Sequence, residues 1–214
     1  MATKQSLYRG AHLILKELAT GVTTGDDTRF VNTLDVVYDD VLNFMLEAGF
    51  WNFATRTVAI EASTDEEPSF GYAYAIAKPD DYAGRIVAIA ADDRFFSPIE
   101  DYQEEGGLSG FIFCDVDPLY LRYISNGVEY GLNLADWPYS FARAVEYELA
   151  FRVAPHLSSM GEDAMVRLER RKEKALRDAK SKDAVNQGSQ RPPAGRLVRS
   201  RGAVSRVSTR RWWG

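Results

Sequence analysis

The stretch Phe50-Trp51-Asn52-Phe53-Ala54 marks the point at which the character of the sequence changes. Before it, apolar residues recur every three or four positions, which is the period of an amphipathic helix. After it, Thr57-Val58-Ala59-Ile60-Glu61 is short and rich in β-branched residues, which indicates a strand. The order of helical and strand-like blocks on either side of this stretch therefore decides the fold class.

Two helices are predicted on the N-terminal side, over about residues 4–19 and 28–48. Gly21 and the polar residues after it separate the two helices, and Gly49 stands where a C-terminal cap of the second is expected. The apolar stripes are Leu7, Ala11, Ile14, Leu15 and Leu18 in the first helix and Leu34, Val37, Val41 and Met45 in the second.

The middle of the chain, about residues 57–126, is predicted to form several short, mostly antiparallel strands. Apolar runs such as Leu119-Tyr120-Leu121-Arg122-Tyr123-Ile124 alternate with turn signals such as Lys78-Pro79-Asp80-Asp81. We expect these strands to form one small antiparallel β-sheet inserted between helical segments.

Two further helices are predicted over about residues 138–156 and 162–182. Pro138 suits a first helical position with Asp136 as a candidate cap before it, and Pro155 is expected to stop or kink the third helix. The fourth helix is strongly charged with a thin apolar face, so it is either largely solvated or lies against a partner.

These elements predict an α+β protein with a four-helix bundle-like core, an inserted antiparallel β-sheet and an extended C-terminal tail. The boundaries are a folded domain over residues 1–185 and a basic extension over residues 186–214. A length of 214 residues and a hydrophobic share of 45% are sufficient for a sizeable core.

Charge is distributed unevenly along the chain. From Ser181 onward eight basic residues face one acidic residue, a net charge of +7, so the remainder of a chain of net charge −5 carries −12. The extension has no helix or strand period and is expected to be disordered when alone in water. Its candidate contact residues are Arg191, Arg196, Arg199, Arg201, Arg206, Arg210, Arg211, Trp212 and Trp213.

The basic extension has three interpretations. Arginine without acidic neighbours, followed by two tryptophans, suits phosphate contacts and base stacking. Arginine and tryptophan are also the residues most enriched as anchors in protein interfaces. The third interpretation is a solubilising end without a binding role. We favour the second interpretation, a clamp in which the extension binds a neighbouring protein subunit, because an oligomer of this chain would place acidic surface close to each extension.

Catalytic, metal-binding and cofactor-binding patterns are absent from the sequence, so we expect no enzyme activity and no cofactor. The pairs Asp39-Asp40, Asp80-Asp81, Asp92-Asp93 and Glu104-Glu105 are predicted to be solvated turns and helix ends. Cys114, the single cysteine, is expected to be a small buried hydrophobe rather than a nucleophile activated by His12 or His156. The Trp51 cluster is expected to be core rather than a platform for bases.

Membrane segments and a secretion signal are not expected. No stretch reaches the roughly 18 apolar residues that a membrane span needs, and the residues after Met1 are polar. The simplest expectation is a protein that stays in the cytoplasm where it is made.

Specific sequence stretches stand at fixed places in this order of helices and strands. Leu7-Tyr8-Arg9-Gly10-Ala11 lies in the first helix, and Trp51-Asn52-Phe53-Ala54 follows the second. Phe70-Gly71-Tyr72-Ala73-Tyr74 comes before Lys78-Pro79-Asp80-Asp81-Tyr82, and Asp117-Pro118 with the run 119–124 precedes the third helix. In this order and spacing, the chain resembles the tail tubular protein A family, the head-to-tail adaptors of short-tailed phages. The resemblance covers roughly residues 4–182 and does not extend to the basic extension.

The resemblance implies a helical bundle carrying a β-sheet insertion and assembled as a dodecameric ring. Such a virion connector is made and assembled in the host cytoplasm. It would lie between the portal protein and the tail nozzle protein, and genomic DNA would pass through its lumen during ejection without sequence-specific binding. The alternative expectation is a small nucleic-acid-binding protein acting through its arginine-rich extension.

Overall fold

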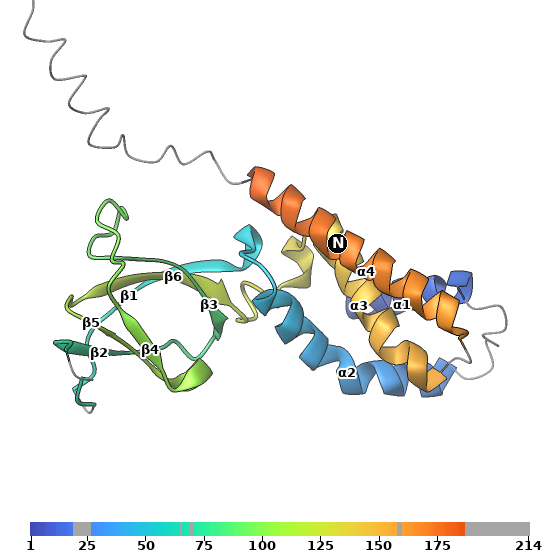
Figure 1. Cartoon of the computed structure of the whole chain (residues 1–214), viewed down its shortest axis with the longest axis horizontal. Helices are drawn as coiled ribbons and strands as arrows, with labels where there is room; N and C mark the ends of the chain where they lie inside the picture. Colours follow the sequence, from blue (N-terminus) through green and yellow to red (C-terminus); the bar gives the residue numbers. More distant parts are fainter. Residues whose placement is uncertain (19–26, 65, 69–70, 158–159, 187–214) are drawn as a thin grey trace, which may run out of the picture.

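The computed structural model of the chain describes residues 1–18, 27–64, 66–68, 71–157 and 160–186. The molecule is elongated, with helices gathered at one end and strands at the other (Figure 1). We call residues 1–49 and 137–186 the helical unit and residues 50–136 the β unit. The mixed helix-and-sheet composition predicted from the sequence is confirmed.

Four α-helices form the helical unit, and the third is central because it contacts each of the other three. Its buried residues include Phe141, Val145, Leu149 and Val153, the four-residue spacing that places side chains on one helix face. Leu7, Ile14, Leu34 and Met45 of the first two helices complete this core. The bounds are α1 Lys4–Leu18, α2 Asp27–Glu47, α3 Tyr139–Leu157 and α4 Glu162–Asn186.

The β unit contains two three-stranded antiparallel sheets where the sequence predicted one. The reason is burial. Leu119, Leu121 and Tyr123 of β6 lie on one face of the first sheet, and this apolar face must be shielded from water by a second layer. The second sheet supplies Ile76 and Ile112 to the same apolar cluster. The order is β1-β6-β3 in one sheet and β2-β5-β4 in the other, with β1 Thr55–Ile60, β2 Tyr74–Ala77, β3 Tyr82–Ala90, β4 Gln103–Glu105, β5 Phe111–Cys114 and β6 Leu119–Ser125.

Three residues at the two ends of α3 differ from the sequence prediction. Pro155 lies inside α3, which continues two residues further to Leu157. Pro138 precedes α3 rather than opening it, because its carbonyl accepts the first helical bond, from the Ala142 N–H at 3.0 Å. The predicted cap, Asp136, accepts instead from the Asn133 side-chain amide at 2.8 Å within a short 3-10 turn.

The end of α2 shows why Gly49 is required, and the reason is not the predicted left-handed cap. Gly49 has no positive φ, but a Cβ there would meet the indole of Trp51 at 2.9 Å. Trp51 is 1% exposed and donates its indole N–H to the Met45 carbonyl at 2.7 Å. The glycine therefore lets the indole close over the end of α2.

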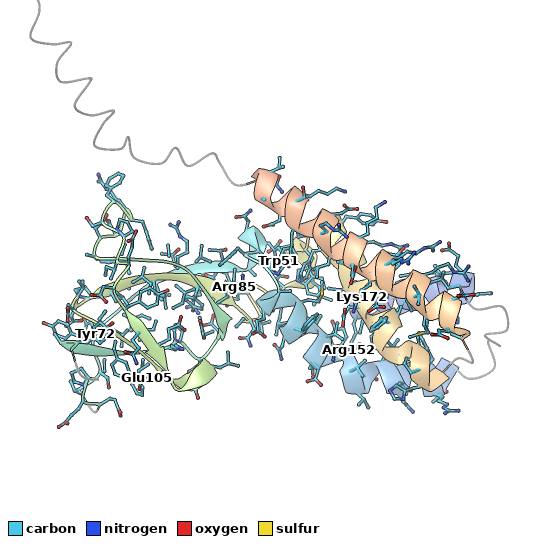
Figure 2. All side chains as sticks on the ribbon, in the orientation of Figure 1. Trp51, Tyr72, Arg85, Glu105, Arg152 and Lys172 are labelled. Carbon is cyan, nitrogen blue, oxygen red and sulfur yellow. The ribbon has the colours of Figure 1, made fainter. Side chains whose placement is uncertain are left out.

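Aromatic rings fill the junction between the two units, where Figure 2 labels Trp51. Phe141 of α3 lies 4.7 Å from the Trp51 ring, 4.7 Å from Phe53 and 4.8 Å from Trp137, measured between ring centroids. The predicted core role of this cluster is confirmed, since the Trp51 ring is enclosed and unavailable for stacking with bases.

Candidate functional site

The acidic charge of the chain is concentrated in the β unit. Its sequence contains 16 Asp and Glu against 5 Lys and Arg, a net charge of −11, whereas the helical unit carries only −1. Within α4 the stretch 167–182 reverses the sign, with 8 basic and 3 acidic residues. The two ends of the elongated molecule are therefore electrostatically different surfaces.

The segment that leads into and includes β4, residues 100–105, contains four carboxylates. Asp101 and Glu105 are both exposed. Asp101 lies two residues before β4 and accepts from the Tyr72 hydroxyl at 3.2 Å, and Glu105 accepts from the Gln103 side-chain amide at 2.7 Å. Glu104 faces the other way and pairs with the buried Lys78 ammonium at 3.0 Å. Figure 2 labels Glu105 at the side of the β unit away from α4.

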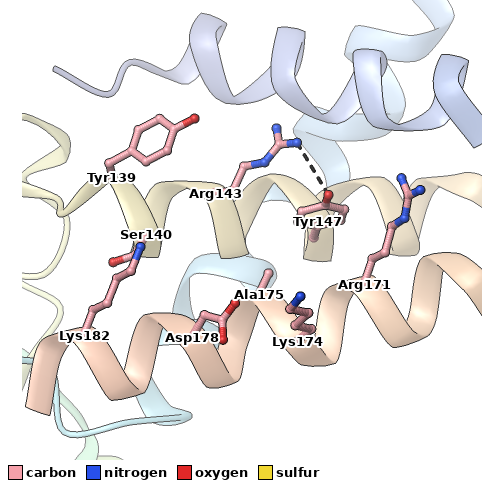
Figure 3. Close-up of a pocket in the computed structure, with 9 residues that line it drawn as sticks. All are labelled: Tyr139, Ser140, Arg143, Tyr147, Arg171, Lys174, Ala175, Asp178 and Lys182. Carbon is pink, nitrogen blue, oxygen red and sulfur yellow. Dashed lines mark hydrogen bonds between the residues drawn. The ribbon is translucent and has the colours of Figure 1, made fainter.

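A cleft of about 400 Å³ lies between α3 and α4 and is mostly basic (Figure 3). It is the strongest candidate for a functional site in the helical unit. Tyr139 stands at one end of the cleft and is 82% exposed. The charged residues that line it are Arg143, Arg171, Lys174, Asp178 and Lys182.

Two of the four cations in this cleft are neutralised within the chain. The Arg143 guanidinium pairs with Glu146 at 2.7 Å, and the Arg171 guanidinium pairs with Glu17 of α1 at 2.8 Å. Lys174 and Lys182 form no ion pair with any carboxylate of the described residues. These two ammonium groups, on one flank of α4, are what the cleft offers to an anionic partner.

A largely buried carboxylate holds the charged fourth helix against α3. Glu148 of α3 is 4% exposed and pairs with Arg152 at 3.0 Å and with Lys172 of α4 at 3.4 Å. The Lys172 ammonium also lies 3.9 Å from the centroid of the Phe151 ring, a favourable cation–π geometry. Although its apolar face is thin, α4 is therefore fixed to α3, so the cleft has defined walls.

The C-terminal end of α4 is anchored to the junction by Asp183, which explains why the helix extends past the predicted end at residue 182. One Asp183 carboxylate oxygen accepts from the Asn52 backbone N–H at 3.0 Å, and its carbonyl accepts from the Asn52 side-chain amide at 2.7 Å. Burial raises the pKa of Asp183, against the lowering effect of the Asn52 hydrogen bond. The sequence offered no signal for this contact, which joins positions 131 residues apart.

Asp81 is not the solvated turn residue that the sequence predicted. Its carboxylate accepts from Arg56 at 2.9 Å, from the Tyr123 hydroxyl at 2.6 Å and from the Ser125 hydroxyl. Burial alone would raise the pKa of Asp81, but the hydrogen bonds from Ser125, Tyr123 and Arg56 outweigh it and lower that pKa. The carboxylate ties the turn before β3 to strands β1 and β6, which is a structural role.

The other predicted residues are dispersed. Cys114 is fully buried in β5, and burial raises the pKa of its thiol, as expected of a small hydrophobe. His12 packs against the Phe30 ring at 5.1 Å in the helical unit, and His156 lies near the end of α3, so neither is placed to activate the thiol. The nine predicted contact residues from Arg191 to Trp213 lie outside the described residues.

A second groove, of about 790 Å³, runs between α1 and α2 and includes Tyr8 and Phe30. Asp35 accepts from Lys4 at 2.7 Å and from the Tyr8 hydroxyl at 2.6 Å, so the Lys4 charge is compensated within the chain. Arg9 also lines the groove, which therefore has fewer cations than the α3–α4 cleft.

Comparison with known proteins adds no relative: no family model matches the chain, and no curated protein matches it. In the part of the chain that the structure describes, no three His, Cys, Asp or Glu side chains gather into a metal-binding group. None of the described helices has the length and apolar character needed to cross a membrane.

Proposed function

We propose that this chain is a structural virion subunit that forms a ring between the portal and the tail nozzle of a short-tailed phage and lets genomic DNA pass. The observation that carries the proposal is the separation of charge between the two units, −11 in the β unit against a basic flank on α4. A rigid chain with opposite charges on different surfaces suits head-to-tail association with its own copies.

The arrangement of the four helices supports a helical bundle with an inserted β unit, the architecture expected of such an adaptor. The contacts of α3 with α1, α2 and α4 support a four-helix bundle that carries the β unit as an insertion between α2 and α3. We assign the bundle and the α3–α4 cleft to contacts within a ring. The resemblance to the adaptor family implies twelve copies in that ring. The basic extension then acts as a clamp on a neighbouring subunit or on the portal.

The testing experiment is the mass of the purified protein, alone and mixed with the portal ring encoded with it. A ring-sized complex on the portal is the expected result. The matched variant ends at Asn186, since a chain ending at residue 182 would also remove Asp183 and its contacts with Asn52. Loss of the complex on this truncation assigns the clamp role to the extension, and a monomer that ignores the portal overturns the adaptor.

A second candidate function is nucleic-acid binding, favoured by the basic flank of α4, which leads directly into an extension of seven arginines and no acidic residue. Binding through phosphates requires a steep loss of affinity with salt. A protein that stays monomeric with the portal but binds a short duplex, with an affinity that falls steeply between about 50 and 200 mM salt, is the nucleic-acid protein.

A further inference from the structure

Two ammonium groups of the α3–α4 cleft form no ion pair with any carboxylate of the described residues. Lys174 and Lys182 are both exposed, and among the described residues that line the cleft the neighbouring Asp178 is the one carboxylate. The basic extension cannot neutralise them, because its charges have the same sign. The cleft therefore fits an acidic partner.

The spacing of these lysines matches the acidic segment at β4. Eight residues of α-helix separate Lys174 from Lys182, a rise of about 12 Å. Asp101 lies two residues before β4 and Glu105 ends it, so the chain between them spans at most about 13 Å. Lys174 and Lys182 line the same cleft, and Asp101 and Glu105 are both exposed, so two ion pairs can form at once between them.

Position in the molecule makes this contact intermolecular. In Figure 1, α4 runs along one side of the helical unit, while β4 lies on the opposite side of the β unit. A chain with complementary patches on opposite sides makes heterologous contacts, which close into a ring when the rotation between copies allows it.

We propose that the β4 segment of one copy, through Asp101 and Glu105, docks in the α3–α4 cleft of the next copy, against Lys174 and Lys182. This contact rests on the proposed ring function and names the surfaces that join its subunits. The exposed Tyr139 at the end of the cleft supplies an aromatic contact for the same neighbour.

A protein partner is favoured over DNA by the surroundings of the cleft. Glu17 and Glu146 already occupy Arg171 and Arg143, so only two cations remain for phosphates. A duplex has phosphates all along its length, and extending it past the cleft would bring it towards a β unit of charge −11.

Charge reversal tests the contact with the full chain on its portal ring. The cleft variant is Lys174→Glu with Lys182→Glu, and the segment variant is Asp101→Lys with Glu105→Lys. Each places like charges opposite one another, and each is expected to raise the protein concentration needed for ring assembly on the order of tenfold or more. Matched controls carry the same charge changes elsewhere, Arg177→Glu with Lys180→Glu on the other flank of α4 and Glu61→Lys with Glu129→Lys in the β unit.

Complementation makes the test specific for a head-to-tail contact. In an equimolar mixture of the cleft variant and the segment variant, every interface of an alternating ring is again complementary, so assembly is expected to return. A chain with all four substitutions is expected to assemble as well, which shows that the variants fold.

Each of the other outcomes contradicts the docking contact, the ring function or both. If the wild-type chain forms rings and the cleft variant forms them equally well, the contact is wrong and the ring function stands. If both variants fail and the mixture does not recover, this pairing of surfaces is wrong. If the cleft variant assembles normally but loses affinity for a DNA duplex, the cleft binds phosphates instead. If the wild-type chain forms no ring on the portal, both the proposed function and the docking contact are wrong.

Discussion

The helical unit and the β unit use charge in different ways. In the helical unit, basic and acidic residues nearly balance, and pairs such as Glu148 with Lys172 join one helix to another. In the β unit most carboxylates have no basic counterpart, yet Asp81 is enclosed by three donors and organises the strands around it. The difference teaches that excess surface charge is suited to partners, whereas the few enclosed charges determine the internal structure.

The largest effect is expected where the two units meet. Trp51→Ala removes a ring that is 1% exposed and the indole donor to the Met45 carbonyl, and we expect it to lower the free energy of unfolding by about 4 kcal/mol. Urea unfolding followed by circular dichroism measures the loss. Trp51→Phe keeps most of the apolar area and is expected to lose about 2 kcal/mol. A loss below about 1 kcal/mol for the alanine variant would show that the units do not depend on this junction.

The next effect tests the enclosed charge of the β unit. Asp81→Ala leaves the Tyr123 and Ser125 hydroxyls and the Arg56 guanidinium without their acceptor, and we expect a loss of about 3 kcal/mol. The neighbouring exposed carboxylate provides the control, since Asp80→Ala is expected to change stability by less than about 0.5 kcal/mol. Equal losses in the two variants would contradict the distinction between enclosed and exposed carboxylates.

The corresponding change in the helical unit is Glu148→Ala. It removes the carboxylate between Arg152 and Lys172, and both cations retain partial access to water, so the expected loss is smaller, about 2 kcal/mol. Glu169→Ala on the exposed side of α4 is the matched control. Thermal unfolding measures both variants, and an unchanged midpoint for Glu148→Ala would show that this carboxylate does not hold α4 against α3.

The sequence predicted the order of helices and strands because apolar period is a local property. Leu34, Val37, Val41 and Met45 reveal α2 without knowledge of any other segment. Contacts between distant positions leave no such trace: nothing in the sequence around Asp183 indicates Asn52, and Asp81 is indistinguishable there from exposed Asp80. The second sheet escaped prediction for the same reason, since β2, β4 and β5 are three or four residues long and are recognised only by their pairing.

The candidate site also combines a local property that the sequence predicts with distant contacts that it does not. The basic character of α4 is evident in the sequence, but whether a cation is available depends on partners in other helices. Arg171 is neutralised by Glu17 of α1, whereas Lys174, three residues later, is not. Only the structure separates the two, and the predicted contact residues of the extension remain predictions.

The smallest effect distinguishes the two enclosed aspartates by the sign of their pH dependence. The pKa of Asp81 is lowered in the folded state, so its contribution to stability is present above the unfolded pKa of about 3.9 and is lost as the pH falls through the folded value. The pKa of Asp183 is raised by burial, so the folded state binds that proton more tightly and stability falls as the pH rises through the interval from about 3.9 to the folded value.

Asparagine variants therefore give opposite results at pH 7. Asp183→Asn removes a buried charge near the C-terminus of α4, where a negative charge also opposes the helix dipole, and keeps an acceptor for the Asn52 N–H. We expect it to raise stability by up to about 1 kcal/mol at pH 7, and Asp81→Asn to lower it. Urea unfolding at pH 7 and near pH 4 measures both: the Asp183→Asn difference should shrink near pH 4, whereas the Asp81→Asn difference should shrink mainly below the unfolded pKa of about 3.9. Destabilisation by Asp183→Asn at pH 7 would mean that the charged Asn52 hydrogen bond outweighs the cost of burial.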